Sequence, residues 1–234
     1  MRVLKLAFES GTAMPILALL FASGASLALV GWRVHWTHDP GYTGLAWNLF
    51  LAWLPLVFAL IASEQNRRTP GQGWRVAVWV GVWILFFPNA PYIFTDLIHL
   101  TNRVQSLFWV DLVLILSCAL TGFVLGFLSL YLIQGLVRER FGLVASWLLI
   151  PVVAVITGFG VYLGRFMRFN SWDILLRPRS ILREVGNWAT SPPSHSTGMV
   201  VPLLFAAFIF TTYLLLYGLT RLRRPFASNP PAGE

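Results

Sequence analysis

Charged side chains are scarce in this sequence. Only 11% of the 234 residues are Asp, Glu, Lys or Arg, and only nine are acidic. A soluble domain of this length needs far more charge on its surface. The mean hydropathy is +0.70, and several apolar runs reach the roughly 20 residues that a helix needs to cross a bilayer. These features exclude a soluble globular protein and predict a polytopic membrane protein.

Cysteine and lysine are almost absent. The one cysteine, Cys118, lies inside an apolar run, so no intramolecular disulfide can form and we expect a packing role for its side chain. The basic residues are nearly all arginines, and the net charge is +8. They gather at the ends of apolar runs, where they suit lipid phosphates. We therefore expect membrane lipids as partners and no nucleic acid.

The apolar runs predict an all-α bundle of about six transmembrane helices in a single domain over residues 1–224, with a disordered tail at 225–234. We place the spans at about 13–32, 43–62, 75–90, 107–133, 143–166 and 198–219. The first run is too long for a signal peptide and is taken as a retained span. We expect a broken or re-entrant segment after the third span. An amphipathic outer helix, around residues 177–188, is expected before the sixth span.

The arginines also predict the orientation. Apart from segment 165–183, most basic residues lie in the loops after the second and fourth spans and at the two ends of the chain. The positive-inside rule therefore favours cytoplasmic N- and C-termini. The outer segment 165–183 is an exception with five arginines. In this orientation the outer side holds all the histidines and aspartates, which are His35, His38, His99, His195, Asp39, Asp96, Asp111 and Asp173. We therefore look for chemistry at the outer face.

The stretch FFPNAPYIFTDLIHL, residues 86–100, interrupts the third span. Its two prolines predict that the helix ends near Phe87, that residues 89–91 are extended, and that a short helix resumes with Thr95 as its N-cap. Asp96 and His99 then share one face. A carboxylate beside an imidazole suits a general base, a proton relay or part of a metal site. The alternative is that Asp96 caps the helix and His99 sits among headgroups.

The stretch GRFMRFNSWD, residues 164–173, is the second polar cluster. Arg165 and Arg168 share a helical face and offer planar guanidinium groups to a phosphate or carboxylate. Asn170, Trp172 and Asp173 follow directly. The alternative is that the arginines snorkel to the interface, that Trp172 belongs to the aromatic belt, and that Asp173 is neutralised by an arginine.

Three further features carry predictions. HWTHD offers His35, His38 and Asp39 as candidate metal ligands, a weak pattern from which we predict no metal site. Asp111, near the start of the fourth span, needs a buried partner, for which Arg103 and Arg165 are the candidates. The pairs Gly122/Gly126 and Gly160/Gly164 have the spacing that lets helices approach closely, so we expect the fourth and fifth spans to pack together.

The two polar stretches together resemble an uncharacterised family of bacterial multi-pass membrane proteins known by a domain-of-unknown-function label. The family is marked by an N-A-P-Y-x-x-T-D-x-x-H-L block, which Asn89, Ala90, Pro91, Tyr92, Thr95, Asp96, His99 and Leu100 match. The likeness covers roughly spans two to six. It implies the same multi-pass fold in a bacterial cytoplasmic membrane, and it implies no reaction or cofactor.

The sequence supports three hypotheses about function. In the first, Asp96, His99 and Asp173 are catalytic and act on an anionic or lipid-linked substrate. Its binding residues would be Asn89, Tyr92, Asp111, Arg165, Arg168, Asn170 and Trp172. In the second, the broken span belongs to a proton-coupled transporter or channel. In the third, the two stretches lock outer loops together in a scaffold or assembly factor. Cofactors and the oligomeric state are left open.

Overall fold

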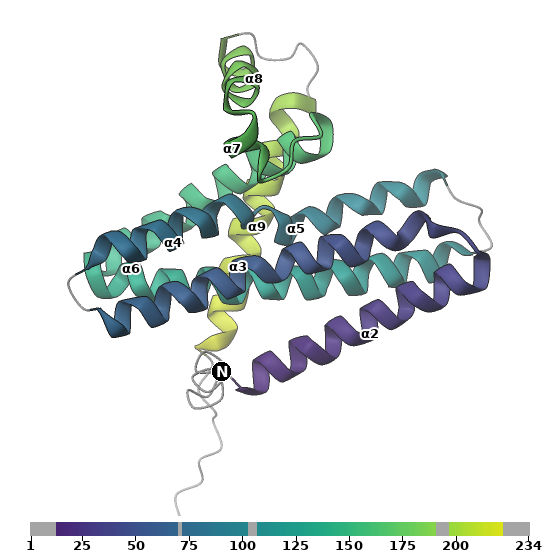
Figure 1. Cartoon of the computed structure of the whole chain (residues 1–234), viewed down its shortest axis with the longest axis horizontal. Coiled ribbons are helices and arrows are strands. Elements are labelled where there is room, and N and C mark those ends of the chain that lie inside the picture. Colours follow the sequence, from purple (N-terminus) through teal and green to yellow (C-terminus); the bar gives the residue numbers. More distant parts are fainter. Residues whose placement is uncertain (1–12, 70–71, 103–106, 191–196, 222–234) are drawn as a thin grey trace, which may run out of the picture.

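The structure is a computed structural model that describes residues 13–69, 72–102, 107–190 and 197–221. All the regular elements in these ranges are helical, and none is a strand, which confirms the predicted all-α class (Figure 1). In chain order the elements are α2 (Ala13–Thr37), η1 (Pro40–Tyr42), α3 (Thr43–Arg68), α4 (Gly73–Phe86), α5 (Asn89–Tyr92), η2 (Ile93–Asn102), α6 (Phe108–Phe166), α7 (Asp173–Leu176), α8 (Pro178–Thr190) and α9 (Thr197–Thr220).

Five segments of the described chain are long and apolar enough to cross a membrane, and the longest of them folds back on itself. That segment is α6, whose 59 residues would span about 88 Å as one straight helix, about three times the hydrocarbon core. Gly142 divides it, with φ 86° and ψ −179°. The ring of Tyr217 contacts both Tyr131 and Trp147, on opposite sides of this turn. The chain is therefore a polytopic membrane protein whose α6 supplies two passages.

The helix α4 ends at Phe86 with Phe87 as its C-cap, as the prolines predict. The apolar passage nevertheless continues through the proline-rich break, from Gly73 to Leu100. The prediction of an extended chain at residues 89–91 is wrong, because α5 is helical there and Pro88 precedes it with φ −58°. Prolines are tolerated in a first helical turn, where backbone N–H groups have no helical partner. Thr95 does not cap a new α-helix either; its hydroxyl donates to the carbonyl of Tyr92 inside η2.

The third passage runs antiparallel to α3. Asn48 near the start of α3 bonds Asp96 in η2, whereas Phe58 further along contacts Trp79 and Phe86 in α4. The chain thus brings η1, η2 and the last turn of α6 to one end of the bundle, called the site end below. The end that contains Gly142 is called the turn end.

The glycine pairs of α6 pack against the break rather than against each other. A Cβ added at Gly126 would lie 2.8 Å from the Cβ of Ala90, and one at Gly160 would lie 2.7 Å from the Cγ of Pro88. Gly122 and Gly164 face Ile93 and Tyr92 in the same way. The expectation that these glycines join the fourth and fifth spans directly is therefore wrong. They make room on both halves of α6 for the proline-rich segment.

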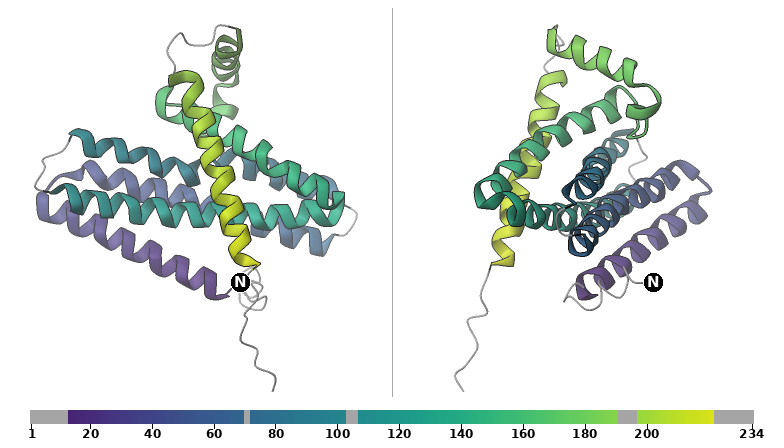
Figure 2. Two further views of the ribbon diagram at one scale, coloured as in Figure 1. Left: turned by 180° about the vertical axis from the view of Figure 1, so that it is seen from behind. Right: turned by 60° about the vertical axis from the view of Figure 1, so that its left-hand side comes forward.

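The last passage, α9, packs on α6 and crosses the other long helices obliquely (Figures 1 and 2). Its closest approach is at Gly158, where any Cβ would collide with the backbone carbonyl of Pro202. Tyr213 in α9 donates a 2.6 Å hydrogen bond to the side-chain carbonyl of Gln134. The short helices α7 and α8 lie beyond the end of α6, outside the bundle of long helices (Figure 2).

Candidate functional site

Asp96 is the buried centre of the polar groups at the site end. Its side chain is 9% exposed and accepts hydrogen bonds on both oxygens. Asn48 donates to Oδ2 at 2.9 Å, and the Nη1 of Arg165 donates to Oδ1 at 3.2 Å. These donors come from α3 and α6, so the carboxylate holds three separate passages together. A buried carboxylate needs such partners because desolvation penalises its charge.

His99 lies one turn further along the 3₁₀-helix η2, on the same side as Asp96. Its Nε2 is 3.7 Å from Oδ1 of Asp96 and 3.5 Å from Nη2 of Arg165. The nitrogen can therefore accept from Arg165 in one tautomer or, when it carries the proton, face the carboxylate. Half of the His99 side chain is exposed (52%), whereas Asp96 is covered. The imidazole is the accessible member of the pair.

A cavity of about 60 Å³ opens beside this pair. This exceeds the roughly 10–15 Å³ that one ordered water requires, so a small polar group fits. Arg165 is not part of the lining; it reaches Asp96 from α6. The lining residues are Gly41, Tyr42, Gly44, Leu45, Asn48, Asp96, His99 and Ile115.

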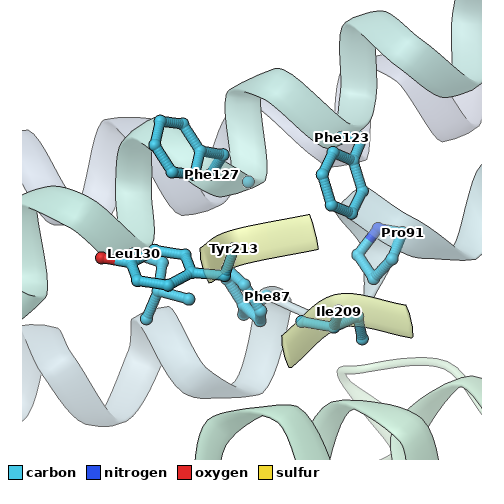
Figure 3. A pocket seen from close by; sticks show the side chains of 8 residues that line it. Phe87, Pro91, Phe123, Phe127, Leu130, Ile209 and Tyr213 are labelled. Atoms are coloured by element: carbon cyan, nitrogen blue, oxygen red, sulfur yellow. The ribbon is translucent and has the colours of Figure 1, made fainter. Parts of the chain in front are cut away.

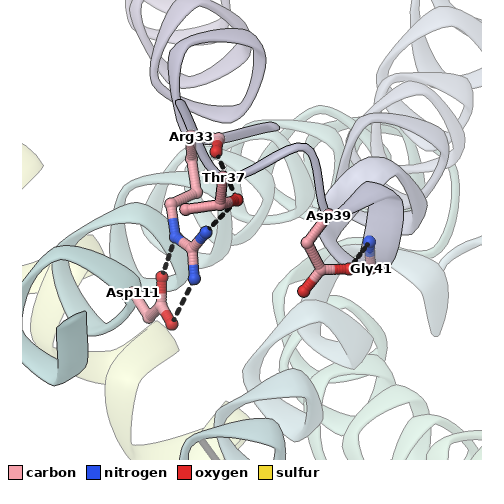
Figure 4. Close-up of polar contacts among 5 residues, drawn as sticks. All are labelled: Arg33, Thr37, Asp39, Gly41 and Asp111. Atoms are coloured by element: carbon pink, nitrogen blue, oxygen red, sulfur yellow. Dashed lines mark hydrogen bonds and ion pairs between the residues drawn. The ribbon is translucent and has the colours of Figure 1, made fainter. Parts of the chain in front are cut away.

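Asp111 is engaged elsewhere, in a fully buried ion pair with Arg33 (Figure 4). The Nε of Arg33 is 2.6 Å from Oδ1 of Asp111, and its Nη2 is 3.2 Å from Oδ2. The guanidinium also donates to Thr37 and lies over the ring of Tyr42, 5.2 Å from its centroid. Arg33 is thus the partner of Asp111 in place of Arg165. Arg103, the other candidate, lies outside the described residues.

The two polar stretches meet through Asn89. Its Nδ2 donates to the Oγ of Ser171 at 3.0 Å and to the carbonyl of Phe86 at 2.9 Å. The second bond satisfies the carbonyl of Phe86, which has lost its helical partner because the proline break ends α4. A hydrogen bond across 82 positions therefore joins the break to the loop after α6.

The remaining candidates in the second stretch lie around this loop. Asp173 is buried and accepts from the backbone N–H of Asn170 at 2.7 Å, so its carboxylate closes the turn that leads into α7. Trp172 is half-buried at the N-cap of α7. Arg168 is exposed and has φ 58°, a left-handed conformation that ends the helix. Asp173 is not drawn into the pair formed by Asp96 and His99.

The HWTHD segment does not gather ligands for a metal. Within the described residues no three His, Cys, Asp or Glu side chains converge closely enough to hold an ion. The rings of His35 and His38 contact each other at 6.3 Å, and the carboxylate of Asp39 accepts the N–H of Gly41 (Figure 4). Asp39 acts as the N-cap of η1, a local role that many Asp residues take. His195 lies outside the described residues.

Sequence reasoning misses three residues of the site end. Asn48 is a lone amide inside the apolar run of the second span, and such an isolated polar side chain in a span is itself a signal of buried pairing. Arg33 reads in the sequence only as a charge in a loop, although it lies in α2 and is 5% exposed. Tyr42, which lines the cavity, carries no signal in the sequence.

A second cavity, of about 10 Å³, lies nearer the middle of the bundle (Figure 3). It lies where the break, α9 and the first half of α6 meet. Its walls are apolar apart from the tyrosine, whose hydroxyl already bonds Gln134. The cavity is too small for more than one water. Its lining residues are Phe87, Pro91, Phe123, Gly126, Phe127, Leu130, Ile209 and Tyr213.

Comparison with known proteins places the chain in one family. No curated protein and no solved structure matches it. A family model with the description "Protein of unknown function (DUF1361)" matches residues 47–213. The matched range contains Asn48, Asp96, His99 and Arg165, and it covers more than half of the chain. The protein therefore belongs to the DUF1361 family of proteins of unknown function.

Proposed function

We propose that the site end binds the anionic group of a small or lipid-linked substrate, with Asp96 and His99 as an acid–base pair for hydrolysis or group transfer. One observation carries this proposal. A buried carboxylate, fixed by donors from two other passages, faces a half-exposed imidazole at a cavity. A base that is oriented by a carboxylate and open to solvent is the arrangement that proton transfer requires.

The hydrogen-bond donors near the site favour an anion. Arg165 is neutralised by Asp96, and Arg33 by Asp111. The carboxylates of Asp39 and Asp173 accept backbone N–H groups, and the guanidinium of Arg168 is exposed. Arg165 also keeps N–H donors beyond the one that it gives to Asp96, because a guanidinium has five. An incoming phosphate or carboxylate that reaches Arg165 would meet these donors.

In this proposal the site end faces the outside of a bacterial cytoplasmic membrane, and both termini are cytoplasmic. The arginines near the turn end support this orientation, because basic residues favour the cytoplasmic side. They are Arg67, Arg68, Arg75, Arg138, Arg140 and Arg221. Labelling of cysteines introduced at exposed positions in intact cells tests it. A membrane-impermeant maleimide should react at Asn187→Cys in α8 and not at Gly135→Cys near the turn end, and the reverse pattern would refute the orientation.

A scaffold role is the second candidate, and the Asp96–Arg165 pair is the observation that favours it. In a scaffold this pair would only lock η2 to the end of α6, and the cavity beside it would bind nothing. A transport role draws less support. Further along α3 from the cavity, Leu49, Ala52 and Leu56 are buried in an apolar core cluster, which favours a closed site over a polar route across the bundle.

Filling the cavity separates a binding site from a scaffold. Gly44 lines the cavity, and a Cβ there would meet nothing within 4 Å, so we expect Gly44→Leu to add bulk beside the cavity without a clash at Cβ. Gly135→Leu is the matched control, since Gly135 is also an exposed helical glycine with open space around it. The probes are inorganic pyrophosphate, glycerol phosphate and a short-chain phosphatidylglycerol, added to the full chain in detergent.

The readout is the thermal midpoint of unfolding. A ligand at 100 times its Kd stabilises the folded state by about 2.7 kcal/mol. We expect at least one probe to raise the midpoint of the wild type and of Gly135→Leu, and to leave Gly44→Leu unchanged. A shift of equal size in both variants would refute the cavity as the binding site. No shift with any of the three probes in the wild type would favour the scaffold.

A further inference from the structure

The segment that contains α7 and α8 is held at the membrane surface from both sides. The passage before it ends at Phe166, and the next candidate span begins at Gly198. Neither α7 nor α8 is long enough to cross a bilayer. Figures 1 and 2 show both helices beyond the end of α6, clear of the long helices. Because the neighbouring passages are long and apolar enough to span a membrane, we expect the bilayer surface to lie near α8.

The residues of α8 divide into two faces at 100° per residue. Ile181, Leu182 and Val185 fall on one side of the helix. Arg179 and Arg183, four positions apart, fall on the polar side, about 60° and 100° from Leu182 at 100° per residue. A helix with an apolar face and arginines on its polar face is the pattern of interfacial helices, which lie along a membrane with the apolar face among the acyl chains.

Much of the apolar surface of these two helices is uncovered. Ile181 is buried, but Leu182 is 70% exposed. In α7, Ile174 is 47% and Leu176 is 72% exposed. Large apolar side chains left exposed on a short surface segment indicate contact with a partner or with lipid.

The arginines beside this surface are available to a partner. Arg177, Arg179 and Arg183 are exposed, and none of them forms an ion pair within the part of the chain that the structure describes. Glu184 is the acidic residue of α8, so the segment 173–190 carries more positive than negative charge. Guanidinium groups bind phosphate through paired N–H donors.

We propose that α7 and α8 form a docking surface for the headgroups of anionic phospholipids. Leu176 and Leu182 enter the boundary of the acyl chains, and Arg177, Arg179 and Arg183 bind the headgroup phosphates. The surface is separate from the cavity beside His99, so this role goes beyond the proposed substrate site. The Asn89–Ser171 hydrogen bond and the Asp173 turn fix where the loop leaves α6, and they set the position of the docking surface at the bilayer.

Cysteine labelling of the full chain in vesicles tests this surface. Cys118 is fully buried, so an added cysteine is the reactive one. An environment-sensitive fluorophore is placed at Leu182→Cys, on the apolar face, or at Asn187→Cys, on the polar face. The vesicles contain phosphatidylcholine alone or with about one quarter phosphatidylglycerol. Acrylamide, a neutral aqueous quencher, measures how far each position is from water.

We expect the probe at residue 182 to be protected from acrylamide, and the probe at 187 to stay accessible. Protection at 182 should increase with phosphatidylglycerol. The double substitution Arg179→Gln/Arg183→Gln should reverse that increase, because each arginine near an anionic surface changes partition about fivefold. Arg138→Gln/Arg140→Gln, at the turn end, is the matched control and should change nothing. Equal quenching at 182 and 187 overturns the proposal. So does protection at 182 that changes neither with the lipid charge nor with substitution of the α8 arginines.

Discussion

Arg33 and Asp111 form a two-point ion pair that is sealed from solvent, with side chains 5% and 0% exposed. The pair joins the last turns of α2 to the first turn of α6, across 78 positions of sequence. Arg33 also covers the ring of Tyr42, which lines the cavity beside Asp96. The pair therefore supports one wall of the candidate site without touching its contents.

Breaking this pair on one side should destabilise the fold strongly. Asp111→Asn leaves the Arg33 charge buried without a counter-charge, and the loss of one partner of a buried pair costs about 3–5 kcal/mol. The double variant Arg33→Met/Asp111→Leu removes both charges and should recover most of the loss. Unfolding by sodium dodecyl sulfate in mixed micelles, followed by tryptophan fluorescence, measures these differences. Additive losses in the double variant would contradict the pairing.

The contact between the break and the second half of α6 predicts a position-specific effect of alanine. Gly160→Ala should lower stability by about 1–3 kcal/mol, since its Cβ would press on the rigid ring of Pro88. Gly24→Ala is the control, because a Cβ at Gly24 would meet nothing within 4 Å. The control should leave stability unchanged or raise it by up to about 1 kcal/mol. The same unfolding assay measures both, and equal effects would argue against close packing at Pro88.

The bond between Asn89 and Ser171 predicts unequal effects of its two partners. Asn89→Ala loses the bonds to Ser171 and to the Phe86 carbonyl, so it should cost about 1–3 kcal/mol. Ser171→Ala loses one bond of a half-exposed hydroxyl and should cost about 0.5–1.5 kcal/mol. A double-mutant cycle should give a coupling energy for the pair. If Ser171→Ala proves as harmful as Asn89→Ala, the second bond of Asn89 contributes nothing.

How much the sequence predicts depends on the distance over which a feature acts. The passages follow from the length of the apolar runs, and the placement of Asp96 and His99 on one face follows from their spacing of three. The partner of Asp111 could not be predicted this way, because Arg33 reaches it only through the packing of α2 on α6. Spacing within one helix carries no information about which helices become neighbours.

The break shows the same limit in the backbone. Two prolines correctly predict that the regular helix is interrupted, since each removes an N–H donor. They do not determine the conformation of the residues beside them, because proline fits the first turn of a new helix as well as an extended chain. The glycines of α6 decide between the two: they leave room for a helical Asn89–Tyr92 segment between both halves of α6. That information lies more than 30 positions from the prolines in the sequence.

The proposed site predicts different effects of substituting Asp96 and His99. Substitution of Asp96 should lower stability, whereas substitution of His99 should remove the response to a ligand. Asp96→Asn removes the charge that Arg165 faces and weakens two hydrogen bonds in a buried position, so it should destabilise the fold by about 2–4 kcal/mol. His99→Ala alters a half-exposed side chain and should change stability by no more than about 0.5 kcal/mol. It should nevertheless abolish the stabilisation by an anionic probe, because the imidazole is the accessible group at the cavity.

Arg165→Gln completes this comparison. It leaves Asp96 with Asn48 as its donor, so we expect a loss of stability close to that of Asp96→Asn, and a double variant no worse than either single one. Thermal unfolding of each variant, with and without pyrophosphate, gives both quantities in one measurement. If the cluster is purely structural, His99→Ala should change neither the stability nor the shift that pyrophosphate causes. The proposed site requires that the histidine variant keep its stability and lose its response, because only His99 among these groups is both oriented by a buried carboxylate and open to a ligand.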